Sequence, residues 1–282
     1  MARPMETLKG GVAVITGAAG GLGRALARQC LDRGMRLALS DVDGTAVEEV
    51  ARSLAPPGGC LAVAADVSRA EDVEALARTA FERFGEVRLL FNNAGVALAR
   101  TVADTTANDW RWLLGVNLWG VIHGIAAFLP RLEAQGTPCR IVNTASAAGF
   151  LSEPAMAAYS VTKHAVVVLS ETLHRELREA GSRVGVTVLC PAFFPTGISE
   201  SERVRPRELP STAPPSAASR EAEERLAKAV RSGRLGPDAI AARALQGVEA
   251  GELHVFTHPK IRLAIEERMH GILEACAPPR QP

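Results

Sequence analysis

The chain has 282 residues, 47% of them apolar and only 4% aromatic, so it can build a sizeable core mainly from Ala, Val and Leu. Its formal net charge of +1 provides no field that would favour nucleic acid or a membrane surface as a partner. No stretch approaches the ~18 uninterrupted apolar residues of a membrane span, and the five cysteines contain no CxxC spacing, so we expect reduced thiols in a cytoplasmic protein.

The first third of the chain alternates short apolar runs with amphipathic stretches. The apolar runs have the length and composition of buried strands and occupy residues 11–16, 36–41, 60–67 and 87–93. The stretches between them repeat their apolar residues with a helical period, at 21–33, 43–54 and 70–84. This order predicts a parallel sheet wrapped by helices.

The second half continues the alternation with longer helices. Thr106 has Asp109 three residues after it, close to a capping box, so a helix is expected from Thr106 to Ala134. Further strands are expected at 139–146, 183–191 and 252–257, and further helices at 156–180, 237–250 and 259–275. The predicted fold class is α/β: one Rossmann-type, doubly wound domain over residues 1–282, with about seven mainly parallel strands and helices on both faces.

Residues 195–220 interrupt this rhythm with five prolines and several Ser and Ala. A structureless stretch of this length inside a compact domain is typical of a lid or of disorder. A short helix is expected after it, at 221–231. We therefore expect 195–235 to be a mobile substrate-loop insert beside the active site; the alternative is a disordered surface loop without function.

The first predicted strand leads directly into a glycine-rich turn and then into a helix. The turn reads TGAAGGLG over residues 16–23. Gly17, Gly21 and Gly23 allow a tight turn and a close approach of the backbone to a pyrophosphate, whose charge is favoured by the free N–H groups of the helix N-terminus. The spacing departs from GxGxxG, but the strand–glycines–helix context is that of a dinucleotide site.

Polar side chains at the ends of other strands extend this site. Asp41 ends the second strand, where a carboxylate can accept both ribose hydroxyls of an adenosine and repels a 2′-phosphate, so NAD is expected rather than NADP. The alternative is that Asp41 only caps the turn that follows it. Asp66 and Val67 are placed to meet the adenine, and the stretch NNAG (92–95) lies where the ligand crevice is expected.

Tyr159 is the only tyrosine of the chain, and Lys163 follows it by about one helical turn. A lysine held beside a phenol favours the phenolate and lowers a pKa that starts near ~10. Such a tyrosine can donate or accept a proton at working pH. The spacing by itself also fits a chance pair on an exposed helix.

Taken together, these motifs resemble those of the short-chain dehydrogenase/reductase family over nearly all of residues 10–260. The resemblance rests on five elements in order: TGAAGGLG (16–23), NNAG (92–95), the Asn of GVNLWG (115–120), Ser146 of IVNTASAAG and YSVTK (159–163). It implies a Rossmann-type domain that performs nicotinamide-dependent hydride transfer between an alcohol and a carbonyl.

The resemblance also implies a role for each site residue. Tyr159 would be the general acid/base, and Lys163 would hold the nicotinamide ribose and lower the pKa of Tyr159. Ser146 would hydrogen-bond the substrate oxygen, and Asn117 would position a water in a proton relay. Cofactor contacts are then expected from Gly17, Gly21, Leu22, Gly23, Asp41, Asp66, Val67, Asn93, Ala94, Gly95, Tyr159, Lys163, Pro191 and Thr196.

The turn after the sixth predicted strand departs from the family pattern. Pro191 is followed by Ala192 where the family usually has glycine, and Ala192 excludes a backbone conformation that only glycine adopts comfortably. Thr196 matches the threonine that usually contacts the nicotinamide amide. Phe193 and Phe194 are alternative packing partners of the ring or of the substrate.

The expected function is that of an NAD-dependent oxidoreductase acting on a hydrophobic secondary alcohol or ketone. The expectation of hydrophobicity comes from the apolar side chains around the presumed pocket: Phe150, Leu151, Met156, Phe193 and Phe194. One alternative is an NADP-dependent carbonyl reductase, and the other is a nucleotide-binding regulatory protein without turnover. The family resemblance also implies a homodimer or homotetramer, with helices 106–134 and 156–180 at the interface.

Other candidate sites weaken on inspection. His254 and His258 are four residues apart, but they lie on a predicted strand and its following turn, so they would not share a helix face, and no metal site is expected. Trp112 and Trp119 fall on one side of the predicted long helix and Trp110 on the other, which favours packing over an aromatic cage.

Overall fold

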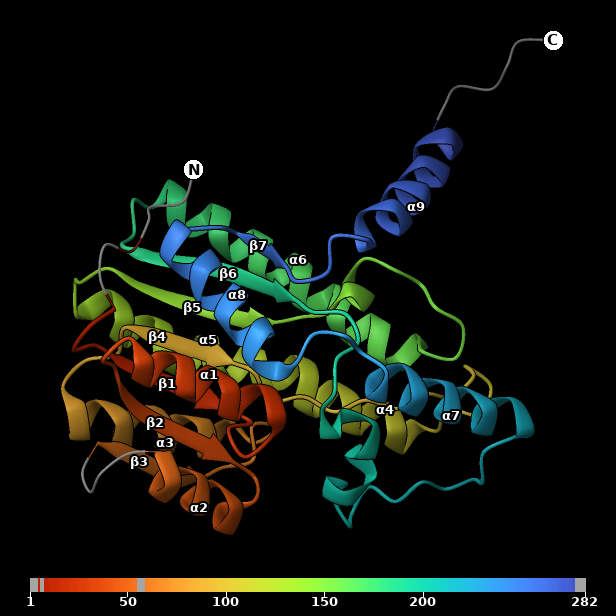
Figure 1. Cartoon of the computed structure of the whole chain (residues 1–282), viewed down its shortest axis with the longest axis horizontal. Helices are drawn as coiled ribbons and strands as arrows, with labels where there is room; N and C mark the ends of the chain where they lie inside the picture. Colours follow the sequence, from red (N-terminus) through yellow and green to blue (C-terminus); the bar gives the residue numbers. More distant parts are fainter. Residues whose placement is uncertain (1–4, 6–7, 55–58, 277–282) are drawn as a thin grey trace.

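Seven short, mostly apolar segments pair into one sheet (Figure 1). The computed structural model describes residue 5, residues 8–54 and residues 59–276, so both ends of the predicted domain 1–282 lie outside the described part. In their order across the sheet the strands are β3 (Cys60–Ala64), β2 (Arg36–Asp41), β1 (Val12–Thr16), β4 (Leu89–Asn92), β5 (Cys139–Thr144), β6 (Val184–Cys190) and β7 (His254–Phe256). Every neighbouring pair is parallel, which confirms the predicted doubly wound α/β class.

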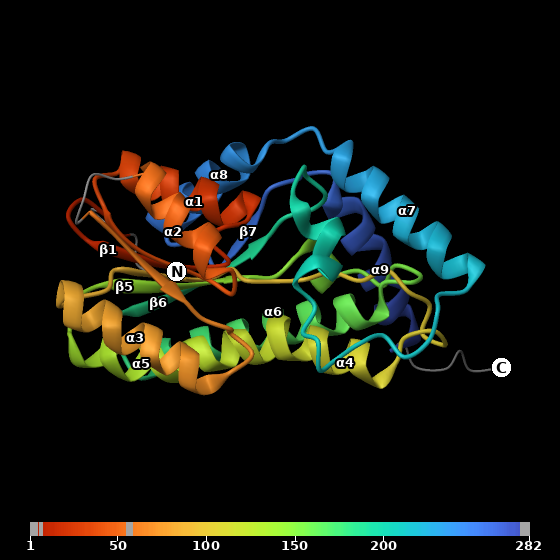
Figure 2. The same cartoon turned by 90° about the horizontal axis from the view of Figure 1, so that it is seen from below.

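Helices cover both faces of this sheet, as two perpendicular views show (Figures 1 and 2). One face carries α1 (Gly21–Asp32), α2 (Gly44–Leu54) and α8 (Pro237–Ala250), and the other carries α3 (Ala70–Phe84), α5 (Gly120–Ala134) and α6 (Ala157–Glu179). Because successive side chains of a strand point to opposite faces, Ile15 packs under the first group and Val14 under the second. Burial on both sides explains why the strands are continuous apolar runs.

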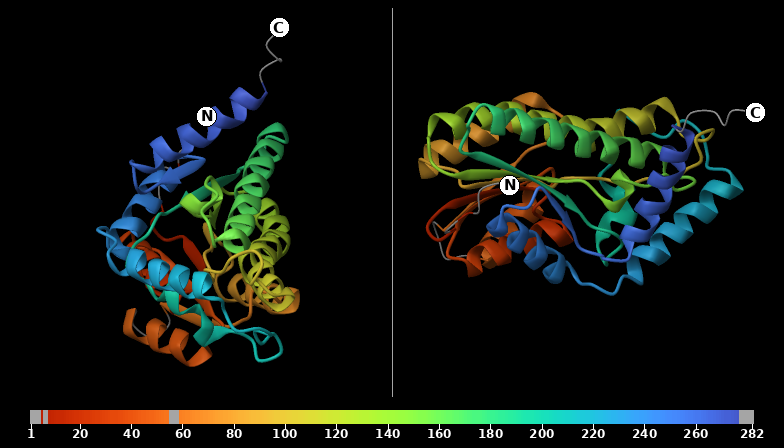
Figure 3. Two further views of the ribbon diagram at one scale, coloured as in Figure 1. Left: turned by 90° about the vertical axis from the view of Figure 1, so that its right-hand side faces the viewer. Right: turned by 90° about the horizontal axis from the view of Figure 1, so that it is seen from above.

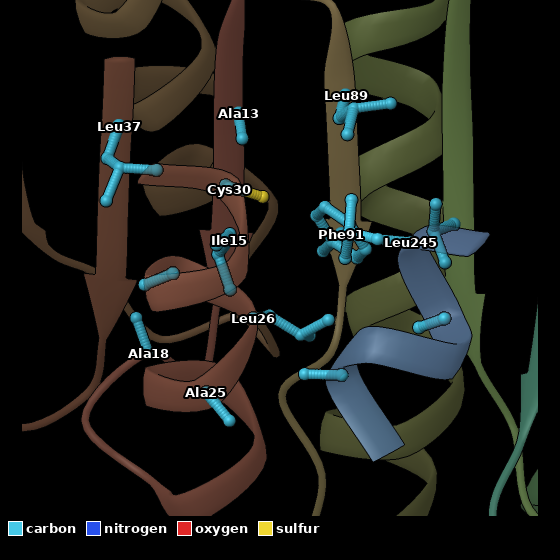
Figure 4. Close-up of a cluster of buried hydrophobic side chains, with 14 of the residues drawn as sticks. Ala13, Ile15, Ala18, Ala25, Leu26, Cys30, Leu37, Leu89, Phe91 and Leu245 are labelled. Carbon is cyan, nitrogen blue, oxygen red and sulfur yellow. The ribbon is translucent and has the colours of Figure 1, made fainter. Parts of the chain in front are cut away.

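The larger core cluster lies between the sheet and the pair α1 and α8 (Figure 4). It brings Ile15, Leu37 and Phe91 of three neighbouring strands together with Leu26 of α1 and Leu245 of α8, all of them fully buried. Burying one side chain of this size contributes about 1.5–3 kcal/mol. The cluster therefore holds the N-terminus of α1 in place just beyond the end of β1.

Two strands, β3 at the edge of the sheet and β4 at its centre, end earlier than the sequence predicts. β3 ends at Ala64 and β4 at Asn92, whereas apolar character alone continued these strands to residues 67 and 93. Local hydrogen bonds replace sheet pairing after each strand: the Asp66 N–H, for example, donates to Asp72 Oδ2 at 3.0 Å. The polar residues that follow the strands are therefore held in turns at the carboxyl edge of the sheet.

The predicted helix 106–134 is in fact two helices joined by a π-helical turn. α4 spans Ala107–Leu114, the π turn η1 spans Gly115–Trp119, and α5 follows directly. The capping box at its start is confirmed, since the Asp109 N–H donates to Thr106 Oγ1 and the Thr106 N–H donates to Asp109 Oδ2.

The π turn changes which side chains share a face. It adds a residue to the helical repeat, so side chains beyond it are rotated relative to those before it. Trp112 is 1% exposed and Trp119 is 51% exposed, and the prediction that both lie on one side is wrong.

The stretch Ala107–Ala134 is long and apolar enough, by length and composition alone, to cross a membrane. In the fold, however, α5 packs against the sheet beside α3 and contributes Ala127, Phe128 and Leu132 to the core. Packing on a sheet accounts for its apolar composition.

The insert 195–235 contains more regular structure than predicted. A 3-10 helix, η3, spans Gly197–Val204, and α7 spans Ala217–Arg231, beginning before the predicted range 221–231. Ser216 caps α7 by accepting a hydrogen bond from the Ser219 N–H at 3.3 Å. The sequence prediction did not use this cap and began the helix at the charged residues. Both elements lie beyond the carboxyl edge of the sheet (Figure 2).

The last helix, α9 (Ile261–Ala275), agrees with the predicted range 259–275. It extends away from the sheet in two different views (Figures 1 and 3), and none of its residues is buried. Leu263 and Leu273 are its most exposed large apolar side chains, at 71% and 66%.

Candidate active site

A cavity of about 1060 Å³ lies at the carboxyl ends of the strands. Its lining includes every residue predicted to contact the cofactor, namely Gly17, Gly21, Leu22, Gly23, Asp41, Asp66, Val67, Asn93, Ala94, Gly95, Tyr159, Lys163, Pro191 and Thr196. Ser146 lines it as well, whereas Asn117 lies behind the wall. In doubly wound sheets this edge is where ligands bind.

The glycine turn is packed too tightly for side chains at two positions. Gly17 has φ 66°, and a Cβ there would lie 2.8 Å from the Ala94 Cα. A Cβ on Gly23 would lie 2.1 Å from the Gly17 carbonyl oxygen. Gly20 caps α1 without a side chain, so the first N–H groups of that helix remain available to an anion.

Thr16, which the sequence analysis did not single out, fixes the relative positions of two loops. Its Oγ1 accepts the Asn93 N–H at 3.0 Å and the Ala94 N–H at 3.1 Å, and the Asn93 side chain donates to the Thr16 carbonyl at 2.9 Å. These bonds attach the turn after β4 to the glycine turn after β1. The two backbone segments expected to face a dinucleotide are thus held as one unit.

Asp41 holds two turns together and also lines the cavity. Its carboxylate accepts the Ala19 N–H at 3.0 Å and the Asp43 N–H at 3.2 Å, so it organises the glycine turn and the turn that follows β2. It also lines the cavity, together with Val42 and Asp43, which were not predicted. This end of the cavity therefore carries acidic side chains.

Ser146, Tyr159 and Lys163 come together at the centre of the cavity lining. Tyr159 and Lys163 share α6, and the Lys163 Nζ lies 5.7 Å from the centre of the Tyr159 ring. The Nζ also donates to the Thr144 carbonyl at 2.8 Å, which fixes the lysine against the end of β5. Ser146 Oγ donates to the Pro191 carbonyl at 3.3 Å and accepts the Ala148 N–H at 3.1 Å.

Burial dominates the electrostatics of this group. It raises the pKa of Tyr159 above its ordinary value, opposed by a hydrogen bond with Ser146. It also lowers the pKa of Lys163 to about 8, because a dry site disfavours the ammonium. Lys163 is not among the groups that shift the pKa of Tyr159, so the lowering expected from the sequence is not found.

Asn117 is fully buried on the π turn. Its Nδ2 donates to the Val96 carbonyl at 2.9 Å and to Thr162 Oγ1 at 3.1 Å, and its Oδ1 accepts the Val96 N–H at 2.8 Å. Both amide hydrogens are thus committed to protein partners. The side chain ties the loop after β4 to α6.

Ala192 is accommodated without strain. Among the described residues other than glycine, only Ala155 has a positive φ, so the turn after Pro191 does not need a glycine conformation. The Ala192 N–H donates to His258 Nδ1 at 3.3 Å. This contact connects the turn to the segment before α9 and gives His258 a structural role.

The part of the cavity beside the insert combines apolar side chains with the charged side chains of Arg203, Arg205, Arg207, Glu208 and Arg225. Of the five side chains expected there, Leu151, Met156, Phe193 and Phe194 line the cavity. Phe150 does not line the cavity, because it packs against Phe256 with 5.2 Å between the two ring centres.

The face of α7 also lines this end and was missed. The residues concerned are Ala222, Arg225, Leu226, Ala229 and Val230. Their spacing places them on one face of the helix, which the sequence analysis did not recognise because charged residues dominate this segment.

Among the residues that the structure describes, no three His, Cys, Asp or Glu side chains are grouped in a way that could hold a metal ion. His254 instead makes a contact of 2.8 Å with Glu171. All five cysteines are free thiols, three of them buried.

Comparison with known proteins gives a consistent match. The short chain dehydrogenase family matches over residues 11–206. The chain is 31% identical to the CLA biosynthesis dehydrogenase/reductase of Lactiplantibacillus plantarum over 97% of both proteins, and 33% identical to the C alpha-dehydrogenase of a Sphingobium species over 97% of this chain and 89% of that protein. Its structure is similar to the crystal structure of a short chain dehydrogenase/reductase from Burkholderia phymatum in complex with NAD, with a TM-score of 0.94, 44% identity and coverage of 99% of both chains.

Proposed function

This chain belongs to the short-chain dehydrogenase/reductase family and is a nicotinamide-dependent oxidoreductase; we propose that it transfers a hydride between NAD(H) and a hydrophobic secondary alcohol or ketone. The observation that carries the proposal is that Ser146, Tyr159 and Lys163 line the same cavity as the glycine turn and Asp41.

The cavity suits a nicotinamide dinucleotide. At the glycine turn a Cβ would fill the cradle, and the free N–H groups of α1 favour a pyrophosphate. Asp41 and Asp43 favour ribose hydroxyls and repel a 2′-phosphate, and the described cationic side chains of the lining all belong to α6, η3, α7 or the segment after η3. These features favour NAD over NADP. When bound, the nicotinamide ring supplies or accepts the hydride.

The protein's residues would handle the proton. As an alcohol is oxidised, its oxygen loses a proton, and the Tyr159 phenolate is the base that accepts it. Ser146 would turn its hydroxyl from the Pro191 carbonyl to donate to the same oxygen. Burial disfavours the phenolate in the protein alone, so the Lys163 ammonium would have to stabilise it in the complex with the bound cofactor. In the reverse direction Tyr159 returns the proton to the carbonyl oxygen. Asn117 would bind a relay water through its backbone carbonyl.

Replacing Tyr159 with phenylalanine tests this assignment. The variant keeps the ring and its packing but has no proton to transfer, so turnover of secondary alcohols with NAD should fall by at least about 10²-fold. NADH binding, followed by fluorescence titration, should remain within about twofold of wild type because the cavity shape is kept. Unchanged turnover would contradict the proposed mechanism, whereas a wild-type protein that binds NADH without any turnover would favour a nucleotide-binding regulatory role.

The cofactor preference is tested separately. Fluorescence titration of the wild-type protein with NADH and with NADPH should give the lower Kd for NADH. Tighter binding of NADPH would overturn the interpretation of Asp41 and make this an NADP-dependent reductase.

We also propose that the protein is a cytoplasmic homodimer or homotetramer. Trp119 of η1 and Val161 and Val168 of α6 are exposed, with exposed fractions of 51%, 49% and 61%. Apolar side chains at such density favour burial in an interface. Light scattering coupled to size-exclusion chromatography distinguishes these assemblies from a monomer.

A further inference from the structure

One arginine of the insert joins the substrate end of the cavity to helix α4. Arg205 follows η3 and lines the cavity, although its side chain is only 7% exposed. Its Nη2 donates to Asp109 Oδ1 at 2.7 Å, its Nε donates to Glu202 Oε2 at 2.7 Å, and its Nη1 donates to the Leu209 carbonyl at 3.1 Å. The guanidinium therefore bridges its own segment and α4 with few donors left over.

The carboxylate that receives Arg205 is built into the start of α4. Asp109 is fully buried, and its Oδ2 accepts both the N–H and the Oγ1 hydrogen of Thr106 at 2.8 Å. Burial raises the pKa of Asp109, but the hydrogen bonds from Thr106 and the charge of Arg205 outweigh this effect and hold the pKa below its usual range. The anchor is thus an ionised group that cannot move without breaking the helix cap.

Arg205 also covers an aromatic wall of the cavity. Its Cζ lies 4.2 Å from the centre of a Trp112 ring, and Trp112 lines the cavity although it is 1% exposed. Trp112 follows Asp109 by three residues on α4, so both lie on the side that faces the insert. One guanidinium therefore holds the ring face and the buried carboxylate together.

Further contacts hold the rest of the insert to the same region. Arg100 Nη1 donates to Ser211 Oγ at 2.8 Å, and Asn108 Nδ2 donates to the Pro210 carbonyl at 3.0 Å. None of the side chains in these further contacts lines the cavity, whereas those of Arg205 and Trp112 do. These bonds help to position the insert, and the contact between Arg205 and Trp112 is part of the cavity wall.

We propose that Arg205 is a positioning residue that shapes the substrate end of the cavity by holding Trp112 and the insert against Asp109. The proposal rests on the proposed function, since it takes this end of the cavity as the binding place of the alcohol or ketone. Arg205 acts through Trp112 and not on the reacting atoms, so its effect depends on how much of the wall a substrate touches. Lysine is not equivalent, because an ammonium lacks the planar fork of donors that stacks flat on the ring while binding Asp109 and Glu202.

The experiment compares 2-decanol with 2-butanol as probes in the variants Arg205→Met and Arg205→Lys, with NADH titration in parallel. In Arg205→Met we expect the KM for 2-decanol to rise by about tenfold, and the KM for 2-butanol and the Kd for NADH to change by less than about twofold. In Arg205→Lys the KM for 2-decanol should still rise by more than about threefold, since the lysine replaces little of the arginine's contact. The matched control is Arg231→Met, which removes an exposed arginine of the same insert and should behave as wild type.

A structural role alone predicts a different pattern. Equal changes for the two alcohols, or a loss of NADH binding that matches the rise in KM, would overturn the proposal. Trp112→Phe provides a second test if Arg205→Met does not fold: it should raise the KM for 2-decanol selectively, and an unselective effect would count against the proposal. A wild-type protein that binds NADH and oxidises neither alcohol nor other secondary alcohols would instead reject the proposed function, and with it this inference.

Discussion

Replacing Gly23 with alanine tests how the glycine turn holds a dinucleotide. A Cβ at this position would lie 2.1 Å from the Gly17 carbonyl oxygen and 2.7 Å from the Ala18 Cα. Both are backbone atoms of the turn itself, so no side chain can rotate away. Since ordinary contacts begin at roughly 3.5 Å, the turn must move by more than about 1 Å.

The magnitude follows from the cost of overpacking. Forcing an extra methyl group into a closely packed site costs about 1–3 kcal/mol. Because the displaced atoms belong to the cradle expected to hold the pyrophosphate, this cost falls on the bound state and corresponds to a rise of about 5- to 150-fold in the Kd of NADH. The better helix propensity of alanine, worth up to about 1 kcal/mol, stabilises α1 and partly offsets any loss of folding stability.

Fluorescence titration with NADH and thermal unfolding separate binding from stability. The matched control is Gly247→Ala in α8, where a Cβ would lie 2.2 Å from a methyl group of Val255, outside the cavity lining. That variant should unfold at a lower temperature while its Kd for NADH stays within about twofold of wild type. The reasoning is refuted if Gly23→Ala binds NADH as wild type does, or if the control loses as much affinity.

Two further predictions concern strain and charge near the same site. Burial lowers the pKa of Lys163 to about 8, so below pH 8 the native protein bears the full cost of a buried ammonium, and between about pH 8 and 10.5 only the unfolded chain keeps that proton. Lys163→Met should therefore unfold at a higher temperature than wild type at pH 7. The gain in the free energy of unfolding is up to about 3 kcal/mol, reduced by the loss of the hydrogen bond to the Thr144 carbonyl. This gain should disappear towards pH 10.5, and a gain that grows with pH would contradict the reasoning. Ala155 has φ 62° in the loop beside the cavity, so Ala155→Gly should relieve strain and stabilise the protein by about 1 kcal/mol in thermal unfolding, and a destabilised variant would show that the loop is not strained.

The fold class could be predicted because its signals are local. Each strand is a short apolar run and each helix repeats its apolar residues with its own period, so the order of elements follows from neighbouring residues. The glycine turn and the capping box of Thr106 and Asp109 likewise consist of residues that are close together in the sequence. For the same reason the predicted cofactor residues all line one cavity, since parallel strands place their carboxyl ends at the same edge.

The errors arose where distant segments meet. The π turn that buries Asn117 breaks the period of a continuous helix, and nothing in the local pattern marks it. The start of α7 was concealed by prolines and charge pairs, although its cavity face has helical spacing. The raised pKa of Tyr159 depends on how completely the surrounding chain excludes water, which spacing along α6 does not contain.

The order of strands and helices, the glycine turn and the residues that meet at the edge of the sheet follow from the amino-acid sequence. The environment of those residues is known from the fold, which buries Tyr159 and Lys163 and brings Arg205 to Asp109 across 96 positions of the chain. Periodicity and turns depend on interactions between residues close in the chain, whereas desolvation and ion pairing depend on the groups that the folded chain places around a side chain.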